Sequence, residues 1–195
     1  MTQLKEILIR FIETFTHLND EEKQFMMDSY EVKELKKGAV LLEEGKVTTD
    51  SFIVLEGCVR KYRIVNGEEK TTDFFTQYQV AADFESLSKG TASKHTLVCL
   101  QKSIIAIIST EAEKEFTKRF PRFKEIEQQE TEKMMGEAQD KLSDFMTSTP
   151  EERYLNLQGT RPELFLIAPQ RQIASYLGIT PESLSRIRKR LAKKG

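Results

Sequence analysis

The sequence predicts an α+β fold in which an antiparallel β-rich body is followed by a long helix and a C-terminal helical module. Three observations lead to this prediction. Apolar residues near the N-terminus recur with the period of a helix, short β-branched and aromatic runs fill the segment from Val32 to Ile108, and helix signals return after Ser109. A chain of 195 residues has room for one large domain or two small ones.

The chain opens with an amphipathic helix. Its apolar residues lie along one stripe and are Leu4, Ile7, Leu8, Phe11, Ile12 and Phe15. Acidic residues interrupt this pattern and no small-residue cleavage site follows, so the segment is not a secretory signal. No stretch approaches the roughly 18 apolar residues of a membrane span, and we expect a cytoplasmic protein without membrane contact. Asn19 or Asp20 can cap a second short helix around Phe25.

Six short runs predict the strands of an antiparallel barrel or sandwich. They are AVLLEE, SFIVLEG, CVRKYRIV, KTTDFFTQY, HTLVCL and SIIAIIS, with Gly38, Gly45, Gly57 and Gly67 between them. Asn66-Gly67 predicts a hairpin, because a type I′ turn requires positive φ at both central residues. Cys58 and Cys99 belong to no CxxC pair, and we expect two buried thiols in a reducing compartment rather than a disulfide or half of a metal site.

Helix signals return after the strands. Thr110-x-x-Glu113 predicts a capping box, and Pro121 ends the helix that it opens. A longer helix is expected from about Pro121 to Met146, although its sparse apolar residues support a coiled-coil heptad only weakly. A long polar helix is marginal by itself, so we expect it to pack on the body or on a second copy.

A domain boundary is predicted at Thr149-Pro150-Glu151-Glu152, which is a complete helix start. The charge changes sign there. Residues 1–149 hold 21 Lys/Arg and 27 Asp/Glu, a net charge of −6, whereas residues 150–195 hold nine and four, a net charge of +5. A basic module after an acidic body indicates an element that binds a polyanion.

The last 27 residues predict a helix-turn-helix. Pro169 opens the first helix, and Gly178 lies where the chain must leave that helix with positive φ. Thr180 can cap the second helix with Pro181 at its first position. The inward positions are Ile173, Ala174 and Leu177 on the first helix and Leu184, Ile187 and Leu191 on the second, with Arg188 at the edge. A surface hairpin with solvated charges would not explain this inward spacing.

The opposite face of the second helix is wholly polar. Near the start of a recognition helix, Arg can pair with guanine and Glu can accept from cytosine, while Lys and Arg further along suit phosphates. The predicted DNA-binding residues are Gln170, Arg171, Thr180, Glu182, Ser183, Ser185, Arg186, Lys189 and Arg190, with Lys193 and Lys194 as further phosphate contacts.

The segment IASYLGITPESLSRIRKRL resembles the helix-turn-helix of the Crp/Fnr family of bacterial transcription regulators, which includes the cyclic AMP receptor protein. The body, KKGAVLLEEGKVTTDSFIVLEGCVRKYRIVNGEE, resembles the double-stranded β-roll of that family. The resemblance implies a cyclic-nucleotide-binding-like β-roll sensor domain over residues 1–120, a dimerisation helix and hinge over 121–148, and an all-α winged-helix/helix-turn-helix domain over 149–195.

The resemblance also implies a function. It predicts a homodimeric regulator, not an enzyme, that binds a pseudo-palindromic operator in double-stranded DNA under the control of an unknown effector, with RNA polymerase as a further candidate partner. The base-reading positions of the family fall on Glu182, Ser185 and Arg186. Pro181 stands where the cyclic AMP receptor branch has an Arg, which favours a TTGA half-site over TGTGA.

The effector site implied by the family argues against cyclic AMP. Alignment on SIIAIIS puts Ala82-Asp83-Phe84 at the element that holds the ribose and Ser93-Lys94 at the Arg-Ser pair that holds the cyclic phosphate. The phosphate Arg is missing, and Asp83 is one methylene shorter than the usual Glu. The candidate effector-binding residues are Asp83, Phe84, Ser93 and Lys94. Either they bind another small molecule or side chains fill the pocket.

No cofactor is expected. Two cysteines cannot supply the ligands of an iron–sulfur cluster, and the isolated His17 and His95 give no haem or metal ligand set. Ser86-Leu87-Ser88-Lys89 fits the S-x-x-K motif of some serine enzymes, but the companion S-D-N and K-T-G motifs are absent. The alternative to the regulator is a dimeric β-roll sensor module that acts through protein contacts without DNA binding, and it leaves the charges of residues 182–189 without a role.

Overall fold

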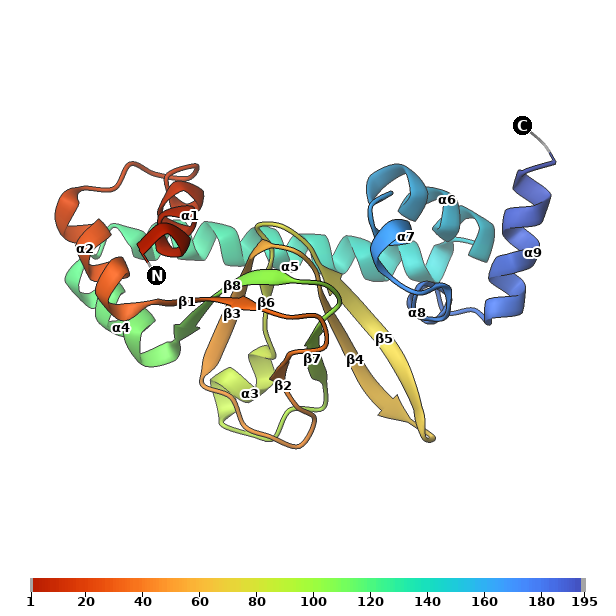
Figure 1. The fold of residues 1–195 in the computed structure, drawn as a ribbon, viewed down its shortest axis with the longest axis horizontal. Coiled ribbons are helices and arrows are strands. Elements are labelled where there is room, and N and C mark those ends of the chain that lie inside the picture. Colours follow the sequence, from red (N-terminus) through yellow and green to blue (C-terminus); the bar gives the residue numbers. More distant parts are fainter. Residues whose placement is uncertain (1, 194–195) are drawn as a thin grey trace. The chain divides into compact units, whose positions relative to one another are not determined.

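The structure, a computed structural model, describes residues 2–193 and divides into two compact units, one ending at Glu127 and the other beginning at Gln128 (Figure 1). The helices of the N-terminal unit are α1 (Thr2–Ile12), α2 (Asp20–Ser29), α3 (Phe84–Lys89), α4 (Thr110–Arg119) and the beginning of α5 (Phe123–Thr147). Its strands are β1 (Glu31–Leu35), β2 (Val40–Leu42), β3 (Asp50–Glu56), β4 (Val59–Val65), β5 (Glu68–Phe75), β6 (Val80–Ala81), β7 (Thr96–Cys99) and β8 (Ser103–Ser109).

Two four-stranded antiparallel sheets form the body, as the barrel or sandwich prediction required. The strand orders are β1-β8-β3-β6 and β2-β7-β4-β5. All six predicted strands are present. The sequence runs missed β1, which is mostly polar and exposed, and β6, which has only two residues. Short or polar strands carry little alternation for a sequence pattern to detect.

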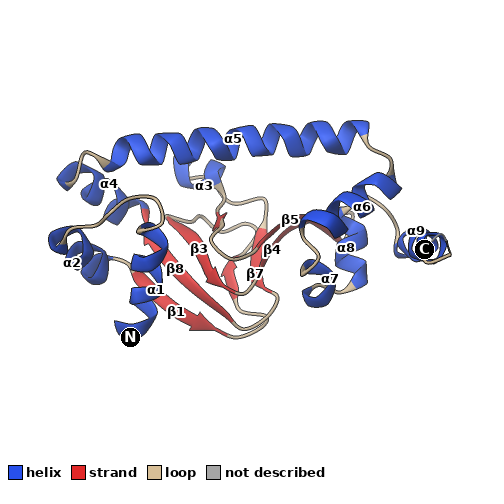
Figure 2. Ribbon diagram, turned by 90° about the horizontal axis from the view of Figure 1, so that it is seen from above, coloured by secondary structure: helices blue, strands red, loops and turns tan. Residues whose placement is uncertain are grey.

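The strands β3 and β8 are buried on both faces. Ile53 and Leu55 join the core under the helices, whereas Phe52 and Val54 of the same strand join the core between the two sheets. Successive strand side chains point to opposite faces, so each strand supplies both cores. Figure 2 shows α1, α2 and α4 gathered beside β1, β8 and β3. The uninterrupted apolar run SIIAIIS therefore reflects a strand without a solvent face.

The N-terminal helices follow their sequence signals closely. Leu8 and Phe11 are buried on α1, but this helix ends at Ile12, so the expected stripe does not extend to the exposed Phe15. Of the two candidate caps for α2, Asn19 is the cap. Its side chain accepts the Glu22 N–H and the Glu22 carboxylate accepts the Asn19 N–H, both at 2.9 Å.

The hairpin turn and the first residues of α4 and α5 lie at or within two residues of their predicted positions. Asn66 and Gly67 both have positive φ, at 53° and 78°, which confirms the predicted turn between β4 and β5. The capping box predicted at Thr110 and Glu113 is wrong: Ser109 is the cap of α4, its side chain accepts the Ala112 N–H, and Ala112 has no side-chain acceptor to return the bond. The long helix begins at Phe123, two residues after the predicted Pro121.

The C-terminal unit is helical. After α5 it contains α6 (Pro150–Thr160), α7 (Leu164–Ile167), α8 (Gln170–Tyr176) and α9 (Pro181–Leu191). The predicted capping box of α6 is confirmed, with Thr149 as the cap and Glu152 as its partner. The all-α prediction holds, but over residues 128–193 no strand that could form a wing is present.

Two smaller expectations concern membranes and cysteines. From residue 2 to residue 193, no helix combines the length and the apolar character needed to cross a bilayer. The thiols of Cys58 and Cys99 are both buried, as expected.

Gly57 offers a test of the close approach between the turn after β3 and the start of β8. A Cβ at this residue, which has φ of +99°, would lie 2.2 Å from Ser103 Oγ and 2.8 Å from Ser103 Cα, whereas one at Gly45, with φ of +87°, would have no neighbour within 4 Å. We expect Gly45→Ala to lower the free energy of unfolding by about 1–2 kcal/mol through backbone strain, and Gly57→Ala to cost at least about 1 kcal/mol more through the clash. Urea unfolding of both variants checks this, and equal losses would contradict it.

Candidate functional site

The helix-turn-helix predicted near the C-terminus is formed by α8 and α9. Ile173, Ala174 and Leu177 are buried on the first helix, and Gly178 leaves that helix with φ of +69°. A Cβ on Gly178 would also lie 2.8 Å from Phe145 Cζ, so this glycine allows a close approach as well as the turn. The first helix and the turn therefore agree with the sequence prediction.

The second helix, α9, begins and packs as expected. The Thr180 hydroxyl accepts the Ser183 N–H at 3.2 Å, and Pro181 occupies the first helical position. Leu184 and Ile187 are buried against the unit, while Arg188, expected at the edge, is exposed.

All the residues proposed to contact DNA remain accessible. Seven are exposed, whereas Ser183 and Ser185 are half-buried; the exposed residues are Gln170, Arg171, Thr180, Glu182, Arg186, Lys189 and Arg190. The Arg186 guanidinium donates to Ser183 Oγ at 3.1 Å, and Thr180 is occupied as a cap. Lys193 is exposed, and Lys194 lies outside the described residues. The polar face of α9 is thus available to a polyanion.

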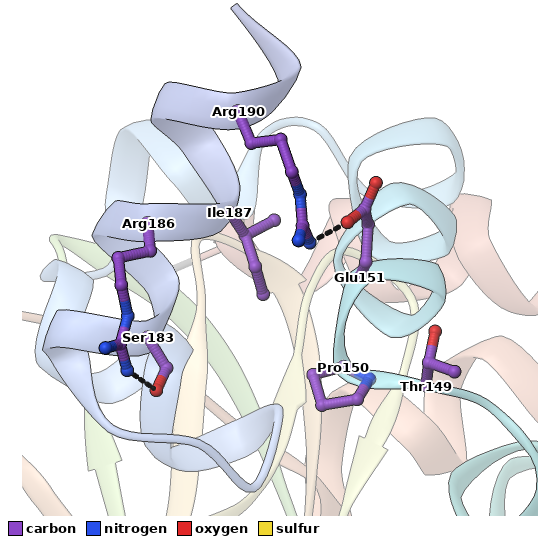
Figure 3. Close-up of a pocket in the computed structure, with 7 residues that line it drawn as sticks. All are labelled: Thr149, Pro150, Glu151, Ser183, Arg186, Ile187 and Arg190. Carbon is purple, nitrogen blue, oxygen red and sulfur yellow. Dashed lines mark hydrogen bonds and ion pairs between the residues drawn. The ribbon is translucent and has the colours of Figure 1, made fainter.

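A cavity of about 460 Å³ lies between this face and the start of α6. Its lining residues are Thr149, Pro150, Glu151, Ser183, Arg186, Ile187 and Arg190, shown in Figure 3. Glu151 forms an ion pair with Arg190, a partner that sequence reasoning missed because the two residues are far apart in the chain. An exposed pair of this kind is worth at most about 1 kcal/mol, so a phosphate can compete with Glu151 for the guanidinium.

Arg153 is a second residue that the sequence did not reveal. It lies on α6 and donates to the backbone carbonyls of Leu177, at 3.0 Å, and Ser148, at 2.6 Å. Its guanidinium also lies 4.6 Å from the centre of the Phe145 ring. One side chain therefore joins the end of α5 and the start of α6 to the turn of the helix-turn-helix.

The four residues proposed for effector binding do not all converge. Asp83 and Ser93 are 5% and 4% exposed, and Ser93 Oγ donates to Asp83 Oδ2 at 2.7 Å. Phe84 is 57% exposed, and the exposed Lys94 pairs with Glu85 at 2.8 Å. The structure therefore brings Asp83 and Ser93 together and turns the other two side chains toward solvent.

Two further residues complete the cluster around Asp83. The sequence suggested that His95 is isolated, but in the structure its Nδ1 lies 3.1 Å from Asp83 Oδ2. Lys61 reaches across from β4 and donates to the carbonyl of Ala82 at 3.0 Å. Asp83 also caps α3, accepting the Ser86 N–H at 3.2 Å. Alternation along β4 directs Lys61 inward, but only the fold reveals its partner.

Burial and hydrogen bonds act in opposite directions on the pKa values of this cluster. Burial alone would raise the pKa of Asp83, but hydrogen bonds from Ser93, His95 and the Ser86 N–H, together with the charge of Lys61, lower that pKa to about 2. Burial lowers the pKa of His95, and the bond to Asp83 only partly offsets this effect. At neutral pH, Asp83 is therefore ionised.

The S-x-x-K motif is not arranged as a catalytic pair. Ser86 is buried and its hydroxyl accepts the Thr48 N–H at 3.1 Å, while the exposed Lys89 pairs with Glu85. Within the part of the chain that the structure covers, no group of three or more His, Cys, Asp or Glu side chains could hold a metal ion.

Asp83 gives a pH-dependent prediction. Its pKa is depressed in the folded state, so its stabilising effect is present above the ordinary pKa of 3.8 and disappears as the pH falls toward 2. We expect Asp83→Asn to be less stable than the wild type at pH 7, and the difference in unfolding free energy to shrink by about 2 kcal/mol between pH 5 and pH 2. Urea unfolding across this range is the measurement, and a gap independent of pH would contradict it.

Comparisons with known proteins agree with this architecture. A model of the cyclic nucleotide-binding domain family matches residues 32–120. The fold is similar to that of FixK2 from Bradyrhizobium japonicum, with a TM-score of 0.70 and 17% identity over 85% of this chain and 86% of that one. No curated protein sequence matches significantly.

Two further solved structures share the fold. The c-di-GMP responsive global regulator CLP of Xanthomonas campestris has a TM-score of 0.70 and 14% identity, covering 91% of this chain and 93% of its own. The catabolite activator protein of Thermus thermophilus has a TM-score of 0.55 and 18% identity, covering 93% and 87%. These findings agree with the resemblance inferred from the sequence: residues 32–120 match the model of the cyclic nucleotide-binding domain family, and the chain is similar in fold to FixK2, CLP and the catabolite activator protein.

Proposed function

We propose that the chain is a sequence-specific DNA-binding transcription regulator and that α9 is its recognition helix. The observation that carries this proposal is the helix-turn-helix, in which buried Leu184 and Ile187 fix one face of α9 and leave Arg186, Lys189 and Arg190 exposed on the remainder. A helix presented in this way fits the major groove of DNA. The proposal includes no enzymatic activity.

The charge distribution supports a nucleic-acid partner. Residues 150–195 carry a net charge of +5, while the rest of the chain is acidic. Phosphate contacts by Lys and Arg release counterions, so binding to duplex DNA should weaken steeply with salt. A sensor module that acts through protein contacts alone would show no salt-dependent binding to random duplex DNA.

A homodimer is part of the proposal. Met135, Leu142 and Met146 are 61%, 61% and 77% exposed on α5. Their spacing of seven and four residues puts them on one stripe of a largely polar helix. An exposed apolar stripe on a long helix is typical of a face that pairs with a second helix. Two copies would present two recognition helices to a pseudo-palindromic operator.

The recognition helix is tested by replacing Arg186 and Lys189 separately. We expect Arg186→Ala to lower specific binding by about 1–3 kcal/mol and to relax the preference at one base pair, because Arg pairs with a base edge. Lys189→Ala should weaken binding to all DNA sequences evenly, because Lys189 is expected to contact a phosphate. The slope of the logarithm of the binding constant against the logarithm of salt concentration should fall by about 1. Binding titrations on a randomised operator library measure both, with Lys118→Ala as an exposed basic control on α4. An unchanged sequence preference in Arg186→Ala would show that α9 does not read bases.

Pairing through α5 is tested by light scattering at micromolar concentration. The wild type should have about twice the chain mass of 22.6 kDa, and Leu142→Glu should reduce it to one chain by placing a charge in the apolar stripe. Gln129→Glu adds the same charge to an exposed position outside the stripe and should leave the dimer intact. The dimer should footprint two half-sites about 34 Å apart, one turn of DNA. A wild-type protein that is monomeric and protects a single half-site would contradict pairing through α5.

Cyclic AMP is not expected to be the effector. No arginine is present at the aligned pair Ser93-Lys94, and Lys94 is exposed and paired with Glu85. The ionised Asp83 also opposes a phosphate. Calorimetric titration with cyclic AMP and cyclic GMP should give no binding. A dissociation constant in the low micromolar range, with a matching gain in DNA affinity, would refute this expectation.

A further inference from the structure

The cluster around Asp83 has the composition of an anion-binding site. A hydroxyl from Ser93 lies 2.7 Å from Asp83 Oδ2, and an imidazole nitrogen from His95 lies 3.1 Å from the same oxygen. The ammonium group of Lys61, held on the neighbouring Ala82 carbonyl at 3.0 Å, adds a positive charge. These donors come from β4 and from the segment that precedes β7, and together they suit a small carboxylate or another oxyanion.

Ser93 and the backbone around it are held by contacts other than Asp83. The Ser93 hydroxyl accepts the His95 N–H at 3.0 Å, and the Ser93 N–H donates to the Lys46 carbonyl at 2.8 Å. The Ser93 carbonyl accepts the Gly45 N–H, also at 2.8 Å. Backbone bonds therefore position the donor segment, and the site should keep its shape when the Asp83 carboxylate is removed.

We propose that Asp83 is a built-in anion that fills an oxyanion site formed by Ser93, His95 and Lys61. An external anionic ligand has no place there while the Asp83 carboxylate is present. The site accepts a small carboxylate from solution once that carboxylate is deleted. This proposal concerns the N-terminal unit alone and holds whether or not the chain binds DNA.

Chemical rescue tests the proposal in the full chain. Asp83→Ala removes the carboxylate but keeps Cβ, which leaves a space the size of formate. Asp83→Gly also removes Cβ, which leaves a space the size of acetate. Sodium formate should raise the melting temperature of Asp83→Ala along a saturation curve, and acetate should do so for Asp83→Gly. At about ten times the dissociation constant, the unfolding equilibrium constant should fall about tenfold.

Three controls separate this site from general salt effects. Sodium chloride at equal ionic strength should not reproduce the rescue. Asp83→Asn fills the same volume and can still cap α3 through its side-chain oxygen, so formate should not stabilise it. Glu21→Ala removes an exposed carboxylate from its ion pair with Arg119, and formate should not stabilise that variant either.

Each outcome decides the matter. If Asp83→Ala is unfolded without additives, the same formate titration is followed by far-UV circular dichroism, and refolding supports the proposal. The proposal is overturned if formate and acetate stabilise both variants equally, whatever the size of the space left, or if they stabilise the wild type as much as the variants. Absence of any rescue in both Asp83→Ala and Asp83→Gly also overturns it, and reduces Asp83 to a helix cap.

Discussion

Strands β3 and β8 must be apolar on both faces, and most of the N-terminal unit depends on this constraint. One face of each strand packs under α1, α2 and α4, and the other packs against the second sheet. Because the side-chain period of a strand is two, a slip of one residue in register would move each side chain of the strand from one core to the other. The paired registers of Phe52 with Ile107 and Ile53 with Ala106 hold both cores in place at once.

In the C-terminal unit, polar contacts to the backbone hold the helices in place. The turn of the helix-turn-helix is held by a hydrogen bond to a backbone carbonyl and by one close approach. Arg153 donates to carbonyls at the end of α8 and between α5 and α6, and Gly178 allows the ring of Phe145 to approach. The orientation of α9 thus depends on residues that never reach its polar face.

The sequence predicts what is encoded locally. Helix ends can be predicted from a few neighbouring residues, because caps and positive φ are properties of short segments. The examples are the N-caps Thr149 and Thr180 and the helix-ending Gly178. The Asn66-Gly67 hairpin belongs to the same class. Ser109 shows the limit of such signals, since two adjacent hydroxyl residues compete for one cap position.

The partners that complete both sites could not be predicted in this way. Lys61 lies more than 20 residues from Asp83, and Glu151 is 39 residues from Arg190, so only the fold brings each pair together. His95 looked isolated for the same reason. Family resemblance placed Asp83 and Ser93 in one site, but it did not show that their polar groups bind each other, which depends on the local path of the chain after Lys46.

The exposed methionines of α5 have a chemical consequence. Thioethers that solvent can reach are oxidised to sulfoxides, which are polar and would weaken an apolar contact between helices. Met135 and Met146 are open to oxidants in a single chain and would be shielded in a pair. With the proposed pairing through α5, their rates of oxidation by dilute peroxide would report the assembly state, and oxidation itself would favour single chains.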